Sequence, residues 1–345
     1  MNITEMLKKF SALTGVSGME SDVASFAGEI LSKYGKTRTD ALGSVICTVR
    51  EPKAGGIHIL LDAHMDEPGM IVSCIEESGF LRVANCGGVD TALLMASPVE
   101  IHTAGGIIEG VICSTPPHLQ SGGDEKKNPK IEDILIDTGF SGGEASKRIR
   151  PGDRVTLQTT PRELLGGLVS SKALDNRAGC VALLHAMECI KDVDCGISVV
   201  FSAMEEVGLQ GARTAAYGLS PTHAVVVDVS YAHTPDSPRE KCGIMGKGPM
   251  IGIAPILSRK LTDKLIKSAE AEGIPYQLEA MGGATGTNAD AIAVAREGVC
   301  TALVSVPIKY MHSPAEIADP ADIEHAARLI AALVQEIAKG GGNHA

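Results

Sequence analysis

Residues able to bind metal ions or transfer protons occur in or directly after four apolar stretches of the sequence. The stretches are IHILLDAHMD, VVFSAMEE, HAVVVDV and ALVSVPIKYMH, and their polar residues are His64 and Asp66, Glu205 and Glu206, Asp228, and His312. In an open α/β sheet the carboxyl ends of the strands line one crevice, where ligands bind. We therefore expect these side chains, although far apart in the sequence, to meet in one site.

The adjacent glutamates and Asp228 are difficult to explain as ordinary surface residues. Successive side chains of a strand point to opposite faces, so a strand through Glu205 and Glu206 would direct one carboxylate into the core. A solvated strand end is the ordinary alternative. Asp228 lies inside an apolar stretch, where an unpaired carboxylate costs several kcal/mol and needs a cation or a full set of hydrogen bonds.

Asp175, in SSKALDNRAGC, is a further candidate because it directly precedes a predicted helix that begins near Asn176. The N-terminus of a helix favours negative charge, so a carboxylate is stable there. A metal ligand and a simple N-cap are equally compatible with this position.

The candidate set combines two imidazoles with several carboxylates and contains no thiolate. Such mixed ligands favour zinc, cobalt or manganese over a structural, cysteine-rich zinc site. Two histidines and a shared aspartate suit two ions about 3.5–4 Å apart that activate one water molecule. A further carboxylate acting as acid and base beside them would complete a hydrolase.

The elements expected to position these residues alternate between apolar runs and helical patterns, as in an α/β sheet covered by helices. Strands are predicted at 57–61, 197–203, 224–229 and 301–306. Helices are predicted within the N-terminal MNITEMLKKFSAL and near 19–34, 176–191, 211–218, 259–272, 288–297 and 320–339. The last of these has an N-cap, Asp319, and a first-turn proline, Pro320.

Between about residues 70 and 163 the pattern changes to short β-type runs separated by Gly, Pro and Asp turns. This predicts an all-β domain at 70–163 inserted into an α/β domain that comprises 1–69 and 164–345. Within the insert, the polar, Gly-rich segment 119–132 is expected to be a mobile loop. The terminal GGGNHA is expected to fray.

Composition limits the class of protein and its partners. The 345 residues carry a formal net charge of −11, which disfavours nucleic acid and acidic membranes as partners. No apolar run reaches the roughly 20 residues of a membrane span, and the N-terminus lacks the pattern of a signal peptide. Nine scattered cysteines without a CxxC pair indicate reduced thiols. We therefore expect a cytoplasmic protein.

With these motifs in place, the sequence resembles metallopeptidase family forty-two, the dinuclear-metal aminopeptidases that include the deblocking, glutamyl and tetrahedral (TET) enzymes. The motifs that carry the resemblance occur in the family's order: AHMDEPG, GGVD, GVICSTPPHL, KALDNRAG, EEVGLQGA, DVSYAHTPD, GKGPMI and MHSPAE. They span nearly the whole chain. The resemblance implies a zinc-peptidase-like mixed sheet between helices, with the insert forming a small β-barrel-like domain used for oligomerisation.

The resemblance also implies a dinuclear site that removes the N-terminal residue of short peptides. It assigns one divalent ion to His64, Asp175 and Asp228, and the other to Asp175, Glu206 and His312, so that Asp175 bridges the two ions of each subunit. Glu205 matches the general base, which takes a proton from the metal-bound water and passes it to the leaving amine. Asp66 matches the carboxylate that orients His64. A cis peptide bond after Asp175 is implied as well.

Several alternatives stay open at this stage. Met204, Pro68 and the stretch GTNAD depart from the family's usual residues, which leaves the preferred N-terminal residue undecided. Some members are labelled endoglucanases, and removal of an acyl group from N-acyl amino acids would use the same metals and base. A metal-binding protein without turnover is the alternative outside enzymes, although it would leave Glu205 without a role. Assembly could stop at a dimer or continue to a dodecamer.

Overall fold

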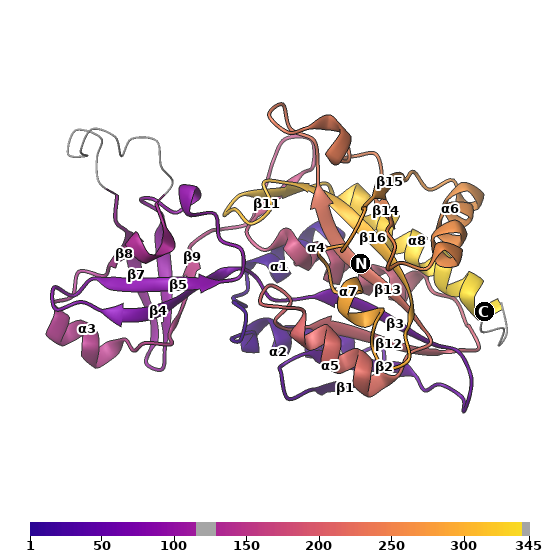
Figure 1. Cartoon of the computed structure of the whole chain (residues 1–345), viewed down its shortest axis with the longest axis horizontal. Coiled ribbons are helices and arrows are strands. Elements are labelled where there is room, and N and C mark those ends of the chain that lie inside the picture. The colour runs from indigo at the N-terminus through magenta and orange to yellow at the C-terminus, as the bar shows by residue number, and fades with distance from the viewer. Residues whose placement is uncertain (115–128, 340–345) are drawn as a thin grey trace.

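The chain forms two bodies, a helix-covered sheet and a closed β-barrel, which Figure 1 shows side by side and joined by a narrow connection. The structure is a computed structural model and describes residues 1–114 and 129–339. Most of the loop predicted at 119–132 and the GGGNHA terminus lie outside the described residues.

The larger body contains an eleven-stranded mixed sheet with the order β1-β2-β12-β3-β13-β16-β17-β11-β10, and β14 and β15 extend it from β16. The four central strands β12, β3, β13 and β16 run parallel. The strands are β1 (Lys36–Thr39), β2 (Val45–Arg50), β3 (His58–His64), β10 (Arg162–Glu163), β11 (Val169–Ser171), β12 (Gly196–Ser202), β13 (His223–Tyr231), β14 (Met250–Ile253), β15 (Gln277–Ala280), β16 (Cys300–Lys309) and β17 (Glu316–Ala318).

All four predicted strands are present in the centre of this sheet, because strands that are buried on both faces read as continuous apolar runs. The observed strand ends differ from the predicted ones by one to three residues, and one of these differences concerns the site. β12 ends at Ser202, and the chain then turns at Met204, which has a φ of 54°. Glu205 and Glu206 therefore lie in a turn beyond the strand, and the expectation that pleating sends one of them into the core is wrong.

Helices cover both faces of the sheet and bury two separate apolar clusters. The larger cluster receives α1 (Ile3–Ala12), α2 (Ser21–Leu31), α4 (Leu174–Cys189), α6 (Arg259–Glu272) and α8 (Pro320–Lys339), and the smaller receives α5 (Gln210–Leu219) and α7 (Ala289–Ile292). The helix predicted at 288–297 is only the single turn α7. The predicted cap of α8 is present, since Asp319 Oδ1 accepts a hydrogen bond from the Ala321 N–H at 2.9 Å.

The smaller body is a closed barrel with its own apolar core. Its strands follow the order β4-β5-β8-β7-β6-β9 and are β4 (Gly69–Ile75), β5 (Leu81–Cys86), β6 (Pro98–Thr103), β7 (Gly106–Ile112), β8 (Leu135–Asp137) and β9 (Arg154–Leu157). The barrel is inserted between β3 and β10 of the sheet. The all-β prediction misses the α-helix α3 (Gly142–Arg148).

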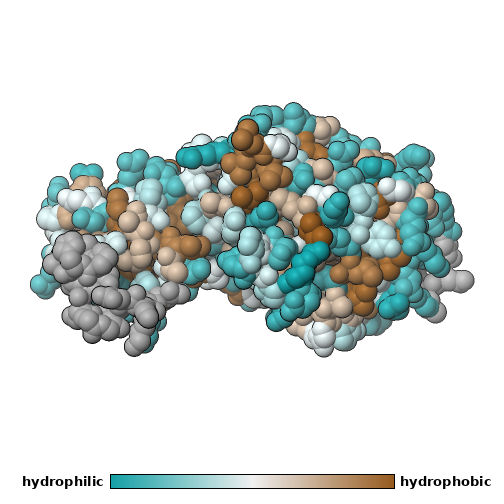
Figure 2. Space-filling view, turned by 90° about the horizontal axis from the view of Figure 1, so that it is seen from above, coloured by the Kyte–Doolittle hydropathy of each residue, from teal (hydrophilic) through white to brown (hydrophobic). Residues whose placement is uncertain are grey.

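Apolar side chains reach the surface of both bodies in separate patches, which Figure 2 shows on one face. On the barrel, Ile107 and Val111 of β7 are 59% and 50% exposed. Within the described residues, no helix is both long and apolar enough to span a bilayer.

Candidate metal centre and active site

A cavity of about 540 Å³ lies at the carboxyl ends of the central parallel strands. Six of the seven predicted site residues line it: His64, Asp175, Glu205, Glu206, Asp228 and His312. They come from the end of β3, the start of α4, the turn after β12, β13 itself, and the segment after β16. The seventh, Asp66, is fully buried behind this lining. The structure thus brings together all the residues that were singled out.

Asp175 lies between the two imidazoles. Its Oδ1 is 3.0 Å from His64 Nε2, and its Oδ2 is 3.2 Å from His312 Nε2. Each imidazole nitrogen also faces a second carboxylate, because Asp228 Oδ1 is 3.6 Å from His64 and Glu206 Oε1 is 3.2 Å from His312. The site therefore consists of two groups of donor atoms that share Asp175.

The backbone at the start of α4 holds Asp175 in this position. The peptide bond between Asp175 and Asn176 is cis, as the resemblance implies. The Asn176 side chain donates to the Val227 carbonyl at 2.7 Å and accepts from the Gly179 N–H at 3.0 Å. These bonds tie the first turn of α4 to β13, the strand that carries Asp228.

Asp66 connects His64 to the pair of glutamates. Its Oδ1 lies 3.4 Å from His64 Nδ1, the ring nitrogen that points away from Asp175. The same carboxylate accepts the backbone N–H groups of Glu205 and Glu206 at 3.0 and 3.2 Å, and the Ser17 hydroxyl at 2.7 Å. Asp66 therefore orients the imidazole through its backbone carbonyl, 3.2 Å from His64 Nδ1, together with its carboxylate, and the carboxylate also holds the turn that carries both glutamates.

The electrostatics of the cluster favour a bound cation. Hydrogen bonds with Asp175 and Glu206 raise the pKa of His312 to about 11. Burial raises the pKa of Asp228 to about 6, and burial together with nearby carboxylates raises the pKa of Glu205 to about 9. Two imidazoles do not offset so many buried carboxylates, whereas divalent ions with oxygen and nitrogen ligands would.

Donor atoms from the two groups also lie close to one another. One ligand atom from each of His64, Asp175 and Glu206 lies within 4.8 Å of the other two. The mixed imidazole and carboxylate set suits zinc, cobalt or manganese. The residues present therefore fit the metal site that the resemblance implies.

Glu316 is a site residue that sequence reasoning did not single out. Its carboxylate accepts the backbone N–H of Asp175 at 3.1 Å and that of His312 at 2.7 Å, and burial raises its pKa. It thereby positions two of the proposed ligands. The signal was present as the final residue of MHSPAE, but a glutamate four residues after a histidine does not by itself indicate such a contact.

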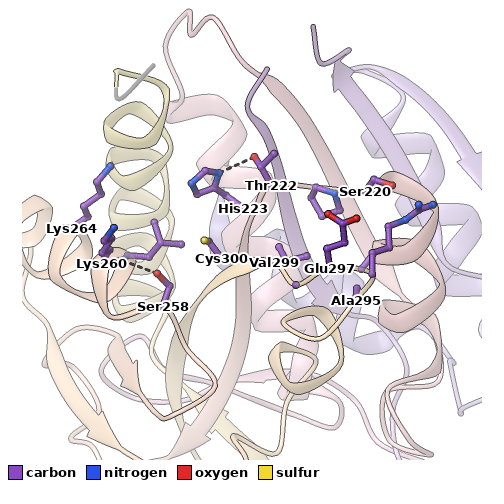
Figure 3. A pocket seen from close by; sticks show the side chains of 15 residues that line it. Ser220, Thr222, His223, Ser258, Lys260, Lys264, Ala295, Glu297, Val299 and Cys300 are labelled. Atoms are coloured by element: carbon purple, nitrogen blue, oxygen red, sulfur yellow. Dashed lines mark hydrogen bonds between the residues drawn. The ribbon is translucent and has the colours of Figure 1, made fainter. Parts of the chain in front are cut away.

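A second cavity, of about 670 Å³, opens where β13 and β16 begin, at the opposite ends of the parallel strands from the metal cluster (Figure 3). Lys260, Lys264 and Cys300 line it, and the Thr222 hydroxyl lies 2.8 Å from His223 Nδ1. Glu297 is the single carboxylate among its described lining residues. This cavity lacks the carboxylate pairs of the first one, so it does not compete as a metal centre.

The family follows from comparison with known proteins. Residues 43–329 match the family described as M42 glutamyl aminopeptidase. The chain is also 32% identical to the lysyl aminopeptidase of Pyrococcus furiosus, over 96% of this chain and 97% of the relative. The chain therefore belongs to the M42 aminopeptidase family, and it is a hydrolase of the aminopeptidase class.

Solved structures share the whole fold. An aminopeptidase from Desulfurococcus kamchatkensis superposes with a TM-score of 0.90 at 35% identity, covering 97% of this chain and 94% of that one. The TET1 peptidase of Pyrococcus horikoshii, described as assembling into a tetrahedron or a large octahedral shell, gives 0.85 at 34% identity and covers 97% and 100%. A Thermotoga maritima protein named endoglucanase gives 0.77 at 29% identity and covers 96% of both chains.

Proposed function

We propose that this protein hydrolyses the N-terminal residue from short peptides with two divalent ions, zinc, cobalt or manganese, in each subunit. His64, Asp175 and Asp228 would hold one ion, and Asp175, Glu206 and His312 the other. The observation that carries the proposal is the position of Asp175, whose two oxygens face two imidazoles, each backed by a further carboxylate.

The ions, when bound, would polarise the substrate carbonyl and make a water molecule more acidic. Glu205 then accepts the proton of the attacking water on its carboxylate and passes it to the nitrogen of the leaving amine. Its position supports this role, because it lines the cavity beside Glu206 and its backbone N–H is held by Asp66. Asp66 keeps His64 oriented through the ring nitrogen that faces away from the cavity.

Two other hydrolytic activities are alternatives for this site. Removal of an acyl group from N-acyl amino acids needs the same metals and base. Endoglucanase activity, suggested by the name of one structural relative, needs two free carboxylates on either side of a glycosidic bond. Metal binding would occupy three carboxylates of this cavity, those of Asp175, Glu206 and Asp228, and the matching family is one of aminopeptidases, so the peptidase is the better-supported function. Binding of metal without turnover would leave Glu205 unused.

The test is hydrolysis of aminoacyl anilides, N-acyl amino acids and a soluble cellulose derivative by one preparation loaded with zinc, cobalt or manganese. We expect release of the chromogenic amine from the anilides, loss of that activity with a chelator, and its return with metal. The variant Glu205→Gln should lower kcat about 10²- to 10⁴-fold, while Glu297→Gln, at the second cavity, should leave it unchanged. Hydrolysis of the cellulose derivative alone, or of acyl amino acids alone, would contradict the proposal.

We further propose that the barrel mediates self-association, from a dimer up to a dodecamer. Ile107 and Val111 place two large apolar side chains on the surface of β7, where a second subunit would cover them. The assembly described for a structural relative supports this proposal. A cytoplasmic location is proposed as well, supported by nine cysteines that are all free thiols.

A further inference from the structure

The proposed metal ligands and base do not account for all the charge in the active-site cavity. Glu279 also lines it, on β15, a strand that carries none of the proposed ligands. Among the described residues, no lysine or arginine lines this cavity. The cavity therefore carries an additional acidic side chain outside the metal cluster.

The sheet directs Glu279 towards the cavity. Side chains alternate along β15, so that Gln277 and Glu279 are half-buried while Leu278 and Ala280 are exposed. The Gln277 side chain fixes the strand by accepting from the Ile244 N–H at 2.7 Å and donating to the Gly248 carbonyl at 2.9 Å. The inward face of β15 thus carries Glu279 on a well-anchored strand.

Two serine hydroxyls hold the Glu279 carboxylate close to the metal cluster. Ser230 of β13 and Ser305 of β16 both hydrogen-bond to it. Ser305 is opposite Asp228 in the parallel register, and Ser230 is two residues further along the strand from Asp228. Neighbouring strands are about 4.8 Å apart and residues two apart in a strand about 6.7 Å. Glu279 is therefore anchored roughly one side-chain length from a proposed metal ligand.

The surroundings of Glu279 fit a long side chain with a charged end. Met281, Leu303 and Met311 supply apolar lining to the same cavity, and Tyr231, which is 60% exposed, lines it nearer to solvent. An aliphatic stem would pack against these residues while its charged end reaches the carboxylate.

We propose that Glu279 recognises the ammonium or guanidinium group of an N-terminal lysine or arginine, and that the enzyme prefers peptides with basic N-terminal residues and disfavours acidic ones. This inference rests on the proposed aminopeptidase function and adds the substrate class.

The hydrogen-bonding capacity of Glu279 supports this assignment. An ionised carboxylate has about four acceptor sites, and the two serine hydroxyls use two of them. Burial raises the pKa of Glu279, whereas the serine hydroxyls lower it. A cation supplied by the substrate would satisfy the remaining sites with charge-assisted hydrogen bonds. An N-terminal glutamate would instead bring a further negative charge into a cavity with no lysine or arginine among its described lining residues.

The experiment compares kcat/KM for the anilides of lysine, arginine, leucine and glutamate on the metal-loaded parent, on Glu279→Gln, on Glu279→Asp and on the control Glu272→Gln at the exposed end of α6. We expect the parent to prefer lysine and arginine to glutamate. In Glu279→Gln the values for lysine and arginine should fall about 10- to 100-fold. The kcat/KM for leucine anilide should change little, and that for glutamate anilide should rise. Glu279→Asp should retain more of the preference than Glu279→Gln does.

The result is the ratio of kcat/KM for two substrates measured on one preparation, so a misfolded fraction of the enzyme lowers both values equally and leaves the ratio unchanged. An unchanged ratio of lysine to leucine in Glu279→Gln would overturn the inference. The ratio also stays unchanged if lysine and leucine lose the same factor, and Glu279 would then act on the α-amino group or on the fold. In both cases cleavage of leucine anilide by the parent would leave the aminopeptidase proposal intact. Failure of the parent to cleave any anilide would overturn both.

Discussion

The buried ion pair between Glu67 and Lys172 is expected to stabilise the protein and to hold the active site together. Both Glu67 oxygens lie 2.7 Å from Lys172 Nζ, and the two side chains are 4% and 10% exposed. Glu67 follows Asp66 directly, and Lys172 lies three residues before Asp175. The pair therefore links the two segments that carry these site residues.

The size of the effect follows from the geometry. At 2.7 Å and an effective dielectric constant near 20, the attraction is about 6 kcal/mol before the cost of desolvation. Removing one partner of a buried pair costs about 3–5 kcal/mol, because the other charge loses its compensation. The change Glu67→Gln would leave Lys172 beside Arg177, whose Nη2 is 3.8 Å from Glu67, with no carboxylate between them. We therefore expect Glu67→Gln to lower the free energy of unfolding more than Lys172→Met does, because Lys172→Met leaves Arg177 as a partner for Glu67.

The assay is urea unfolding followed by circular dichroism, with anilide hydrolysis measured in parallel. Removing both charged groups in one variant should destabilise less than the sum of the two single changes, by about 0.5–3 kcal/mol. The control is Asp194→Asn, which breaks a pair with Lys53 at 2.6 Å whose side chains are 76% and 73% exposed, and it should leave the unfolding midpoint unchanged. A loss below about 1 kcal/mol in Glu67→Gln, or strict additivity, would refute the reasoning.

Three further predictions concern the site, the pH dependence of stability and the assembly. Metal analysis should show that Glu206→Ala loses bound ion, whereas Glu205→Gln keeps near-parental metal content. In the anilide assay, Glu205→Gln should lose kcat about 10²- to 10⁴-fold. Equal metal loss in both variants would contradict the separate roles. Burial lowers the pKa of His58 below its usual 6.5, so the unfolded chain binds this proton more readily than the folded chain does, and stability should fall as pH drops from 7 through 6.5. The variant His58→Gln should make the unfolding temperature less dependent on pH in this range. An unchanged dependence of the unfolding temperature on pH would count against this role of His58. Sedimentation should show smaller assemblies for Ile107→Asp than for the parent, and a monomeric parent at micromolar concentration would rule out assembly through the barrel.

Local patterns in the sequence predict the central strands, and they single out residues that the structure gathers at one cavity. β3, β12, β13 and β16 are buried on both faces, and their apolar runs can be recognised without knowledge of their neighbours. The predictions fail where the local pattern of apolar residues does not determine where a strand or helix ends. The turn after β12 depends on a left-handed backbone at Met204, and the short α7 lies where helical periodicity continues to 297.

The sequence by itself determined the family, the α/β class with its β insert, and the residue types of the candidate site, because these depend on local periodicity and on ordered motifs. Only the tertiary structure decided how the side chains meet. Asp175 faces two imidazoles that are 111 residues before it and 137 residues after it in the chain, and Glu279 reaches the cavity through β14 and β15, which join the sheet beside β16. Such contacts depend on strand order and register, which are set by packing between distant segments and leave no periodic signal in either segment alone.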